Sequence, residues 1–567
     1  MLAACASTSR LWDVVLFPLL LLLLLLACTG PVYAAVPVSQ PSGGAPTPGN
    51  VVFSNFFGIS LELSFINYYL GNDSSTVPAP VVQYLSALHA HGSGKPVRLR
   101  LGGNSMDSST YVPGQADLIH FTDPDANAND QPIDFGAQLF DTMNAMSDAV
   151  GGAEYLVGLS LRTPNNTNIP LLAGDIQKAV GDKIDAFLLG NEPDLYSAHG
   201  QRPYLKNYTT DDYIDDYQTV FNALQNTPQG DVLSLNNIAG PTTCCFWDLA
   251  PVLQSGWLDK YKQQLKYITV QHYPQNTCTG KPSFGVEWYI VHANTVRLAS
   301  WQTPGITMAN AAGKPMIMDE FNSIACGGAQ GVSNTFGVAL WTADYALQLA
   351  AVGYKAAYIH TREPGITYNP FDPPHVPAAQ AGAWLTQPPY YAMLPVAEAL
   401  EGTDGARVVD LNLQNSKTVQ TATAAGYAIY AGASAAIRTL VLFNYQNASG
   451  ATADYAIDAA LAAQAGSAAA GAVTVRYLAA ASVNEATEIA YGGLTYAGVG
   501  DAHPVPATFA ASRPDANMSC ADGCTVQVPG PGMAVVFFGG PSTATAAANS
   551  SANATNSDAI YVGARNW

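Results

Sequence analysis

Short apolar runs that end in polar residues recur along the first 400 or so residues of the chain. Longer stretches with apolar residues at a spacing of three or four separate them, a pattern typical of strands alternating with amphipathic helices. Val81 to His91 and Tyr213 to Leu224 are two of the predicted helices. The predicted strands are Phe56 to Glu62, Val97 to Gly103, Glu154 to Leu161, Asp185 to Gly190, Leu235 to Gly240, Tyr267 to His272, Pro315 to Asp319 and Ala356 to His360.

Eight strand–helix units in this part of the chain predict an α/β fold of the (β/α)8 TIM-barrel type over residues 51–400. An open doubly wound sheet fits this number of units less well. No Gly-x-Gly-x-x-Gly or Walker loop follows the first predicted strand, which argues against nucleotide binding. In a barrel of this kind the reacting groups follow the carboxyl ends of the strands.

The pattern changes from about Gly402 to alternating segments such as Arg438 to Phe443, Val473 to Leu478 and Ala534 to Phe538. This alternation predicts a C-terminal antiparallel β-sandwich domain over residues 401–541. Residues 542–567 are rich in Ser, Thr, Ala and Asn, so we expect a flexible tail. The alanine runs between Ala459 and Ala481 fit either helices or loops.

Composition narrows the class of protein. The 567 residues exceed the roughly 250 to 300 that one core usually serves, which agrees with two domains. The net charge of -19 and the pI of about 4.6 argue against nucleic acid as a partner, since nucleic-acid binders present clustered Lys and Arg. The oligomeric state is not indicated by the sequence.

The N-terminus resembles a secretory signal. Arg10 precedes an apolar run from Val14 to Ala27, and Val32-Tyr33-Ala34 offers small residues around a cleavage point. We therefore predict a signal peptide over residues 1–34, a linker over 35–50 and a secreted, extracellular protein with no stable membrane insertion after signal removal. A membrane anchor is the alternative, but Asp13 and Pro18 interrupt the run.

Export would allow disulfides and N-glycans. Cys520 and Cys524 are close enough in sequence to pair, whereas Cys244, Cys245, Cys278 and Cys326 allow three pairings. Zinc is disfavoured because the chain lacks paired Cys-x2-Cys or His-x3-His spacings, and we predict neither a metal nor another cofactor. Sequons, which predict surface positions, occur at Asn72, Asn165, Asn207, Asn447, Asn517, Asn549 and Asn553.

Two glutamates end predicted strands. The fourth strand runs into Asn191-Glu192-Pro193, and the seventh runs into Asp319-Glu320-Phe321. Glycoside hydrolysis needs one carboxyl group that protonates the leaving oxygen and a second that attacks or stabilises the anomeric carbon. A single glutamate after a strand is commonly a cap or a surface residue, but a pair across a barrel mouth favours this chemistry, with Glu192 as acid/base and Glu320 as nucleophile.

Several motifs resemble glycoside hydrolase family 79, the β-glucuronidase and heparanase family of clan A. The Asn-Glu-Pro motif at residues 191–193 resembles the clan's acid/base signature. Four further segments narrow the resemblance from the clan to family 79. They are Arg98 to Ser105, Leu189 to Asp194, Gln271 to Pro274 and Asp319 to Ser323. The resemblance covers the barrel and extends through the β domain. It implies a retaining glycosidase that acts on β-glucuronide linkages in carbohydrates or proteoglycans.

Neighbouring residues acquire expected roles from this resemblance and from their chemistry. Asn191 is similar to the clan residue that hydrogen-bonds the sugar 2-hydroxyl, with a structural role in a turn or cap as the alternative. Tyr273 is similar to the tyrosine that donates a hydrogen bond to the nucleophile, with core packing as the alternative. Glu62, Asn104 and Asp107 are candidates for binding sugar hydroxyls, with structural capping an equal alternative.

Recognition of a uronic acid would require a partner for its carboxylate. Arg362, which follows the eighth predicted strand, is the nearest candidate cation for this role, but the adjacent Glu363 can neutralise its charge. Members of the resembled family instead use loop amides and tyrosines after strands seven and eight, which makes Tyr368 the candidate here. His272 and His360, at strand ends, are expected to form hydrogen bonds rather than bind a metal.

Two other functions fit the same sequence. One is a clan A exo-glycosidase acting on neutral sugars, which would use the same two glutamates. The other is a secreted carbohydrate-binding protein that kept the barrel without turnover, since a fold alone does not fix function.

Overall fold

The computed structural model describes residues 34–40, 50–202, 205, 207–374, 383–448 and 450–541. The predicted signal peptide, most of the predicted linker and the predicted tail lie outside these residues. Within them, no helix has both the length and the apolar character needed to cross a membrane.

Eight parallel strands close into a barrel, in which the last strand pairs with the first. In spatial order from the first they are β2 (Phe57–Glu62), β3 (Val97–Gly102), β7 (Ala153–Leu159), β8 (Ile184–Leu189), β9 (Ile238–Thr243), β10 (Leu265–His272), β11 (Met316–Phe321) and β12 (Tyr354–Thr361). The predicted TIM barrel is confirmed.

The strand β9 begins three residues later than the sequence pattern predicts. The residues Val232–Leu235 form a 3-10 helix, and Asn236 ends it in the left-handed region with φ 52°. Asn tolerates this conformation because its short polar side chain can bond locally. Leu235 therefore belongs to a helical turn, and the strand starts only at Ile238.

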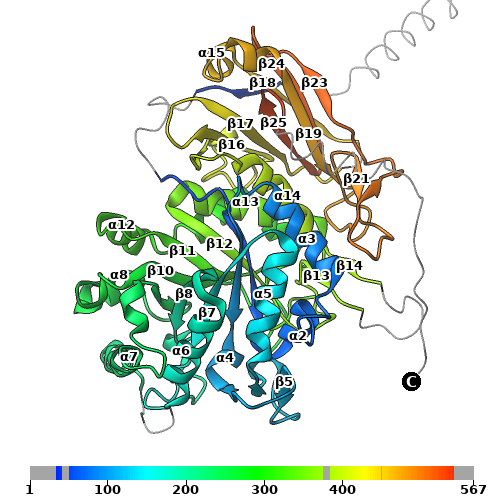
Figure 1. Ribbon diagram of the computed structural model, residues 1–567. Coiled ribbons are helices and arrows are strands. Elements are labelled where there is room, and N and C mark those ends of the chain that lie inside the picture. Colours follow the sequence, from blue (N-terminus) through cyan, green and yellow to red (C-terminus); the bar gives the residue numbers. More distant parts are fainter. Residues whose placement is uncertain are drawn as a thin grey trace, which may run out of the picture.

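Helices surround the barrel on its outer side (Figure 1). The helix α7 (Thr210–Leu224) starts with a capping box in which the side chains of Thr209 and Asp212 each bond the other's backbone amide. The other helices that follow or precede the barrel strands are α2 (Ile66–Leu70), α3 (Ala79–Ala90), α4 (Asn104–Ser108), α5 (Gln138–Val150), α6 (Asn168–Val180), α8 (Leu249–Val252), α9 (Leu258–Tyr261), α10 (Val286–Tyr289), α11 (His292–Ala299), α12 (Thr303–Ala311), α13 (Phe336–Val352) and α14 (Pro388–Leu400).

Two small sheets belong to the loops around the barrel. The first contains β4 (Thr110–Tyr111), β5 (Ile119–Phe121) and β6 (Ile133–Phe135), and the second β13 (Phe371–Asp372) and β14 (Leu385–Thr386).

The barrel interior is packed and is not a pore. Leu156, Leu188, Ile317 and Tyr358 form a buried apolar cluster inside it. Layers of inward-pointing side chains fill such barrels and leave the mouth at the carboxyl ends of the strands for polar groups.

The C-terminal domain is a β-sandwich, as predicted. Its nine-stranded sheet has the order β15–β16–β17–β25–β19–β20–β21–β22, with β23 paired to β19, and its second sheet has the order β1–β18–β24. The bounds are β1 (Val36–Val38), β15 (Ala406–Asp410), β16 (Ala424–Ala431), β17 (Ile437–Asn444), β18 (Thr452–Ile457), β19 (Val473–Ala479), β20 (Ala490–Tyr491), β21 (Leu494–Thr495), β22 (Val505–Pro506), β23 (Ala516–Met518), β24 (Cys524–Pro529) and β25 (Gly532–Phe538).

Two segments of this domain differ from simple expectation. The strand β1 lies within the predicted linker; Val36 and Val38 are buried on one face, and the strand pairs with β18. The alanine-rich segment contains the helices α15 (Ala459–Ala463) and α16 (Ser467–Gly471), followed by β19. Asp458 caps α15 by accepting from the Leu461 amide.

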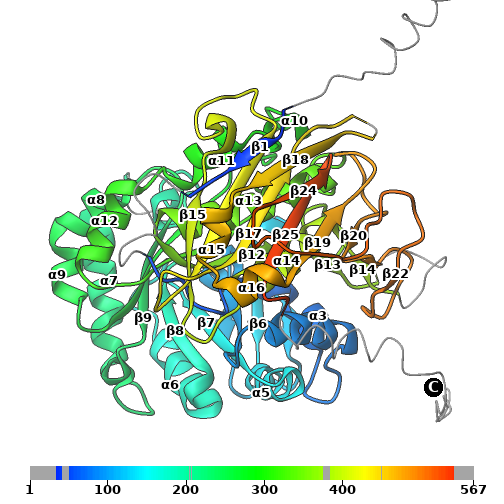
Figure 2. The same cartoon turned by 90° about the horizontal axis from the view of Figure 1, so that it is seen from above.

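The helices α13 and α14 lie between the barrel and the larger sheet (Figures 1 and 2). Nearly every residue of α13 is buried, because one side packs on the barrel and the other on the β domain. Tyr427, Phe443 and Val535 of the sheet share a single apolar core with these helices. The opposite face of the same sheet packs on β18 and β24 in a second core.

The described residues contain three disulfides, Cys244–Cys245, Cys278–Cys326 and Cys520–Cys524. The second joins the loop after β10 to the loop after β11. Sequon asparagines within the described residues are all exposed, namely Asn72, Asn165, Asn207, Asn447 and Asn517.

Candidate active site

Glu192 follows β8 in an unusual backbone conformation. Its φ of 48° and ψ of 54° lie in the left-handed region, which a non-glycine residue seldom adopts. Gly190, two residues earlier, also has positive φ, at 82°. Such conformations persist where surrounding contacts hold them and are concentrated at functional sites. The turn holds the Glu192 side chain at the carboxyl end of β8, with only 9% of its surface exposed.

Hydrogen bonds from three neighbouring segments hold this turn. Asp107 Oδ2 accepts from the Asn191 amide at 3.2 Å, and Thr242 Oγ1 donates to the Gly190 carbonyl at 2.9 Å. The Asp194 carboxylate accepts backbone N–H groups from the loop after β9, including that of Cys245 at 2.7 Å. The position of Glu192 is therefore fixed by α4, β9 and the loop after β9 together.

Glu320 is placed by an irregularity in β11. The pairing of β10 with β11 runs from Val270 opposite Met318 directly to Gln271 opposite Glu320, so Asp319 is an extra residue in the strand. Alternation would otherwise direct Asp319 and Glu320 to opposite faces. With the bulge, both carboxylates approach the same guanidinium, that of Arg100.

Arg100 is the functional residue that the sequence did not single out. It lies on β3, is 1% exposed, and its Nη1 donates to Glu320 Oε2 and, at 2.8 Å, to Ser60 Oγ. Its Nη2 donates to Asn191 Oδ1 at 2.7 Å. One buried guanidinium thus bridges the loop of the predicted acid and the predicted nucleophile. The alternation Val97-Arg98-Leu99-Arg100 was the available signal, because both arginines fall on one face of a buried strand.

Tyr273 and His360 complete the surroundings of Glu320. The Tyr273 hydroxyl donates to Glu320 Oε1 at 2.7 Å. His360 lies between two carboxylates, with Nδ1 3.8 Å from Glu320 Oε2 and Nε2 3.3 Å from Glu62 Oε2. Burial alone would raise the pKa of Glu320, but His360, Arg100 and the Tyr273 hydrogen bond together lower it below its ordinary value. Glu320 is therefore ionised at and below neutral pH.

The pKa of Glu192 moves in the opposite direction. Burial raises it well above the ordinary value, and the nearby carboxylates of Glu320 and Asp194 raise it further. With the oxygen and nitrogen of the Gln271 amide assigned in the orientation that satisfies both, the nitrogen donates to Glu192 Oε1 at 3.2 Å and the oxygen accepts from Arg100 Nη2 at 2.9 Å. Two nearby carboxyl groups with separated pKa values are suited to act as an acid and as a base or nucleophile.

Three predicted sugar-binding residues make protein contacts instead of pointing freely into the site. Glu62 Oε1 accepts from the Ser105 amide at 2.9 Å. Asn104 Oδ1 accepts from Asn191 Nδ2 at 3.0 Å. Asp107 Oδ1 accepts from the Leu161 amide at 3.2 Å, and the Tyr196 hydroxyl donates to Oδ2. These contacts fit the capping alternative for Asp107 and a supporting position for Glu62 and Asn104.

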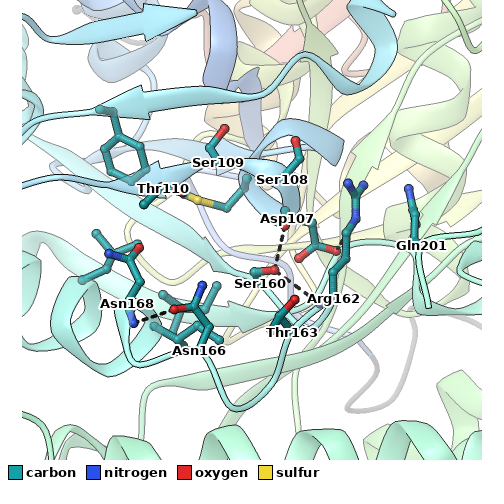
Figure 3. A pocket seen from close by; sticks show the side chains of 15 residues that line it. Asp107, Ser108, Ser109, Thr110, Ser160, Arg162, Thr163, Asn166, Asn168 and Gln201 are labelled. Carbon is teal, nitrogen blue, oxygen red and sulfur yellow. Dashed lines mark hydrogen bonds and ion pairs between the residues drawn. The ribbon is translucent and has the colours of Figure 1, made fainter. Parts of the chain in front are cut away.

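Asp107 also borders a polar cavity of about 380 Å³ beside the barrel mouth (Figure 3). Its backbone carbonyl accepts from Ser160 Oγ at 2.8 Å, and its Oδ2 lies 3.7 Å from Arg162 Nε. Burial raises the pKa of the Asp107 carboxyl, although the positive charge of Arg162 acts to lower it. The cavity lies between the loops after β3 and β7.

The side chains considered for uronate recognition lie after β12. Arg362 is buried and donates to both carboxylate oxygens of Glu363, at 2.9 and 3.0 Å, and to Asn129. Tyr368 is 1% exposed, and its ring lies 6.2 Å from that of His360. Tyr368 therefore lies on the same side of the site as Glu62 and His360.

The described residues contain one dense group of metal-ligand types, Glu192 with Cys244 and Cys245. The two sulfur atoms are bonded to each other, so neither is a thiolate ligand. His272 stacks on Trp301 at 4.1 Å between ring centroids, and burial lowers its pKa to about 4.

Comparison with known proteins identifies the C-terminal domain. Residues 426–535 match the model of the glycosyl hydrolase family 79 C-terminal β domain. The predicted resemblance to family 79 is confirmed. The β-glucuronidase of Aspergillus niger is 28% identical over 429 residues, which are 70% of this chain and 73% of that protein. The β-glucuronidase of Neurospora crassa is 27% identical over 408 residues, 65% of this chain and 68% of that protein.

Solved structures share the two-domain fold. A 4-O-α-L-rhamnosyl-β-D-glucuronidase from Fusarium oxysporum matches with a TM-score of 0.68 and 19% identity over 88% of this chain and 100% of that one. A family 51 α-L-arabinofuranosidase from Bifidobacterium longum matches with a TM-score of 0.57 and 14% identity over 89% and 100%. The predicted enzyme class, a glycosidase similar to β-glucuronidases, is borne out by the two β-glucuronidase relatives and by the family 79 domain match.

Proposed function

We propose that the chain is a secreted retaining glycoside hydrolase that cleaves β-glucuronide linkages, with Glu192 as acid/base and Glu320 as nucleophile. The observation that carries the proposal is the burial of Glu192 and Glu320 at the ends of β8 and β11, joined through Arg100 and Asn191, in surroundings that shift the two pKa values in opposite directions. The similarity to two fungal β-glucuronidases supports a glucuronide as the substrate. The N-terminal sequence pattern supports export.

In the first step, the Glu320 carboxylate attacks the anomeric carbon while Glu192 transfers its proton to the leaving oxygen. The glycosidic bond breaks and an ester to Glu320 forms. In the second step, ionised Glu192 accepts a proton from water, and the water oxygen displaces Glu320 from the anomeric carbon. Tyr273 keeps its own proton throughout, because burial and the Glu320 charge raise its pKa.

Asn191 is the proposed partner of the sugar 2-hydroxyl. Its Oδ1 is held by Arg100 Nη2 and its Nδ2 by Asn104, so the side chain is oriented before substrate arrives. A preorganised amide loses little conformational freedom when the transition state forms. Asn104 accepts a hydrogen bond from Asn191 directly, and Glu62 accepts one from the backbone amide of Ser105, the residue after Asn104.

The substrate carboxylate is proposed to bind to loop amides and Tyr368 rather than to Arg362. Both outer nitrogens of Arg362 already serve protein acceptors, and Glu363 neutralises its charge. A further anion would have to displace Glu363 from a buried, bidentate ion pair, which is costly.

A panel of 4-nitrophenyl β-glucuronide, β-glucoside, β-galactoside and α-L-arabinofuranoside tests the substrate class. Release of nitrophenol from the glucuronide at a kcat/KM at least about tenfold above the other glycosides, a difference of about 1.4 kcal/mol, supports the proposal. Preferential turnover of a neutral glycoside would favour the exo-glycosidase alternative. Binding without turnover of any glycoside would favour the carbohydrate-binding alternative.

A further inference from the structure

The loop after β9 carries a disulfide between adjacent cysteines that the proposed reaction does not use. Sulfur atoms of Cys244 and Cys245 and a carboxylate oxygen of Glu192 all lie within 4.8 Å of one another. The two residues were unpaired candidates in the sequence, and nothing in the catalytic cycle requires sulfur next to the proton donor.

This disulfide is held rigidly to the acid/base loop. Asp194, two residues after Glu192, accepts the backbone N–H groups of Cys244 at 3.1 Å, Cys245 at 2.7 Å and Phe246 at 2.7 Å. Asp194 itself is only 5% exposed. A buried carboxylate with three amide donors fixes the turn strongly. The turn and Glu192 therefore keep a constant relative position.

The outer surface of the turn is apolar and open. Cys245 is exposed, and Phe246 has 69% of its surface exposed, the highest value among the large hydrophobic residues that the structure describes. Phe246 and the neighbouring Cys245 form one exposed apolar patch, and covering such a patch with a ligand gains hydrophobic free energy. Sulfur is polarisable and packs well against ring faces and C–H groups. The disulfide and the aromatic ring together offer a surface suited to the C–H face of a sugar.

The disulfide turn lies on the leaving-group side of the scissile bond, as its neighbours in the barrel indicate. The residues that contact Glu320 are Arg100 of β3, Tyr273 directly after β10 and His360 of β12. The strand β9 supplies none of these contacts and borders Glu192 through β8. The acid/base residue meets the glycosidic oxygen, so a surface next to it and outside the Glu320 cluster faces the departing residue.

We propose that the Cys244–Cys245 disulfide and Phe246 form a platform that binds the hexopyranose residue on the leaving-group side of the scissile bond. This inference rests on the proposed function. The platform stacks on the C–H face of that residue and presents its linking oxygen to Glu192. It would favour saccharide substrates over glucuronides with small leaving groups.

Two substrates separate platform binding from the chemistry at Glu192 and Glu320. Cellobiouronic acid places a glucose residue on the leaving-group side, whereas β-glucuronyl fluoride places only a fluorine atom there. The measured quantity is the ratio of kcat/KM for cellobiouronic acid to that for the fluoride, in the wild type, Phe246→Ala and the double variant C244A/C245A. Leu235→Ala is the matched control, because Leu235 is also exposed, at 51%, but precedes β9 at the opposite end of the strand.

The proposal predicts that the ratio falls about tenfold in Phe246→Ala, equivalent to about 1.4 kcal/mol, and at least as much in C244A/C245A. The ratio in Leu235→Ala should equal that of the wild type. An unchanged ratio in Phe246→Ala would overturn the platform, even if the double variant fails to fold. Wild-type protein that hydrolyses neither substrate would instead contradict the proposed function.

Discussion

Around Glu320, a histidine, an arginine and a tyrosine control the charge on which the proposed reaction depends. Arg100 is buried among Glu320, Asp319 and Asn191, so its charge is compensated entirely by the site. Burial raises the pKa of Asp319 to about 7 against the attraction of Arg100. The pKa of Glu320 is lowered instead, by His360, by Arg100 and by the hydrogen bond from Tyr273. This difference identifies Glu320, and not its neighbour, as the carboxylate that stays ionised.

Replacing Tyr273 with Phe should raise the pKa of Glu320, because the hydrogen bond that favours its charged form is lost. Activity requires ionised Glu320, so the acidic limb of kcat/KM against pH should move to higher pH by about one unit, or about 1.4 kcal/mol. The alkaline limb, set by Glu192, should change less. Tyr68→Phe is the control, because Tyr68 is exposed on α2. An acidic limb that stays in place would contradict the role of Tyr273.

Substitutions at Arg362 and Tyr368 distinguish two ways of binding the uronate carboxylate. If loop amides and Tyr368 bind the carboxylate, Arg362→Ala retains the preference for glucuronide over glucoside, whereas Tyr368→Phe reduces it by about fivefold to tenfold. The measurement is kcat/KM for both 4-nitrophenyl glycosides in each variant. A loss of roughly 1.5 to 3 kcal/mol of glucuronide preference in Arg362→Ala would instead show that the arginine binds the carboxylate.

At the scale of elements, three strand ends build the site in different ways. The turn after β8 uses positive φ at Gly190 and Glu192, β11 uses a bulge at Asp319, and β9 ends in the disulfide turn. The sequence predicted the strands and both glutamates, because apolar runs that stop at a carboxylate are local signals. It did not predict Arg100 as their bridge, since that contact exists only once barrel closure brings β3 close to β8 and β11.

The same limit explains Asp107 and the cysteines. Asp107 was a reasonable sugar-binding candidate from its position after β3, but the fold places the Asn191 and Leu161 amides around it. The pairing of Cys244 with Cys245 was one of three open options, and spacing alone could not select it.

A second buried charge cluster joins the barrel to the β domain. His292 of α11 bonds Asp344 of α13 at 2.9 Å through Nδ1 and Asp410 of β15 at 3.1 Å through Nε2. The Tyr427 hydroxyl donates to Asp344 Oδ1 at 2.6 Å. Burial opposes the charge on His292, but the two aspartates raise its pKa to about 10.

This cluster predicts a pH-dependent contribution to stability. The folded-state pKa of His292 lies above the unfolded value of about 6.5, so its contribution is complete below about pH 6.5 and is lost as the pH rises toward 10. His292→Gln should lower Tm by several degrees at pH 6, and the difference from wild type should shrink by pH 9.5. His503→Gln, at an exposed position, is the control. A difference in Tm that is independent of pH would contradict a protonated His292.

For the whole molecule, the β domain completes the outer layer of the barrel. The helices α13 and α14 are buried on both sides, and Tyr427, Phe443 and Val535 share one core with them. Arg476 of β19 adds ion pairs to Glu398 of α14 and to Asp515. We therefore propose a domain boundary near residue 400 and treat the two domains as one folding unit.

A chain that ends at Glu401 should be insoluble or unstable, because the removed sheet would leave apolar faces of α13 and α14 exposed to water. Soluble yield and Tm measure the effect. A chain that ends at Pro541 retains every strand of the described β domain and serves as the control. Soluble and active protein ending at Glu401 would show that the barrel folds without the β domain.

The most direct test of the central claim is to identify the residue that carries the sugar during turnover. A 2-deoxy-2-fluoro-β-glucuronyl fluoride slows both steps but retains a good leaving group, so a covalent intermediate should accumulate on a retaining enzyme. Peptide mass spectrometry after digestion should find the fluoroglucuronyl group on Glu320, with no label in Glu320→Gln. A label on another residue, or no label while the wild type releases an inverted first product, would contradict the assignment.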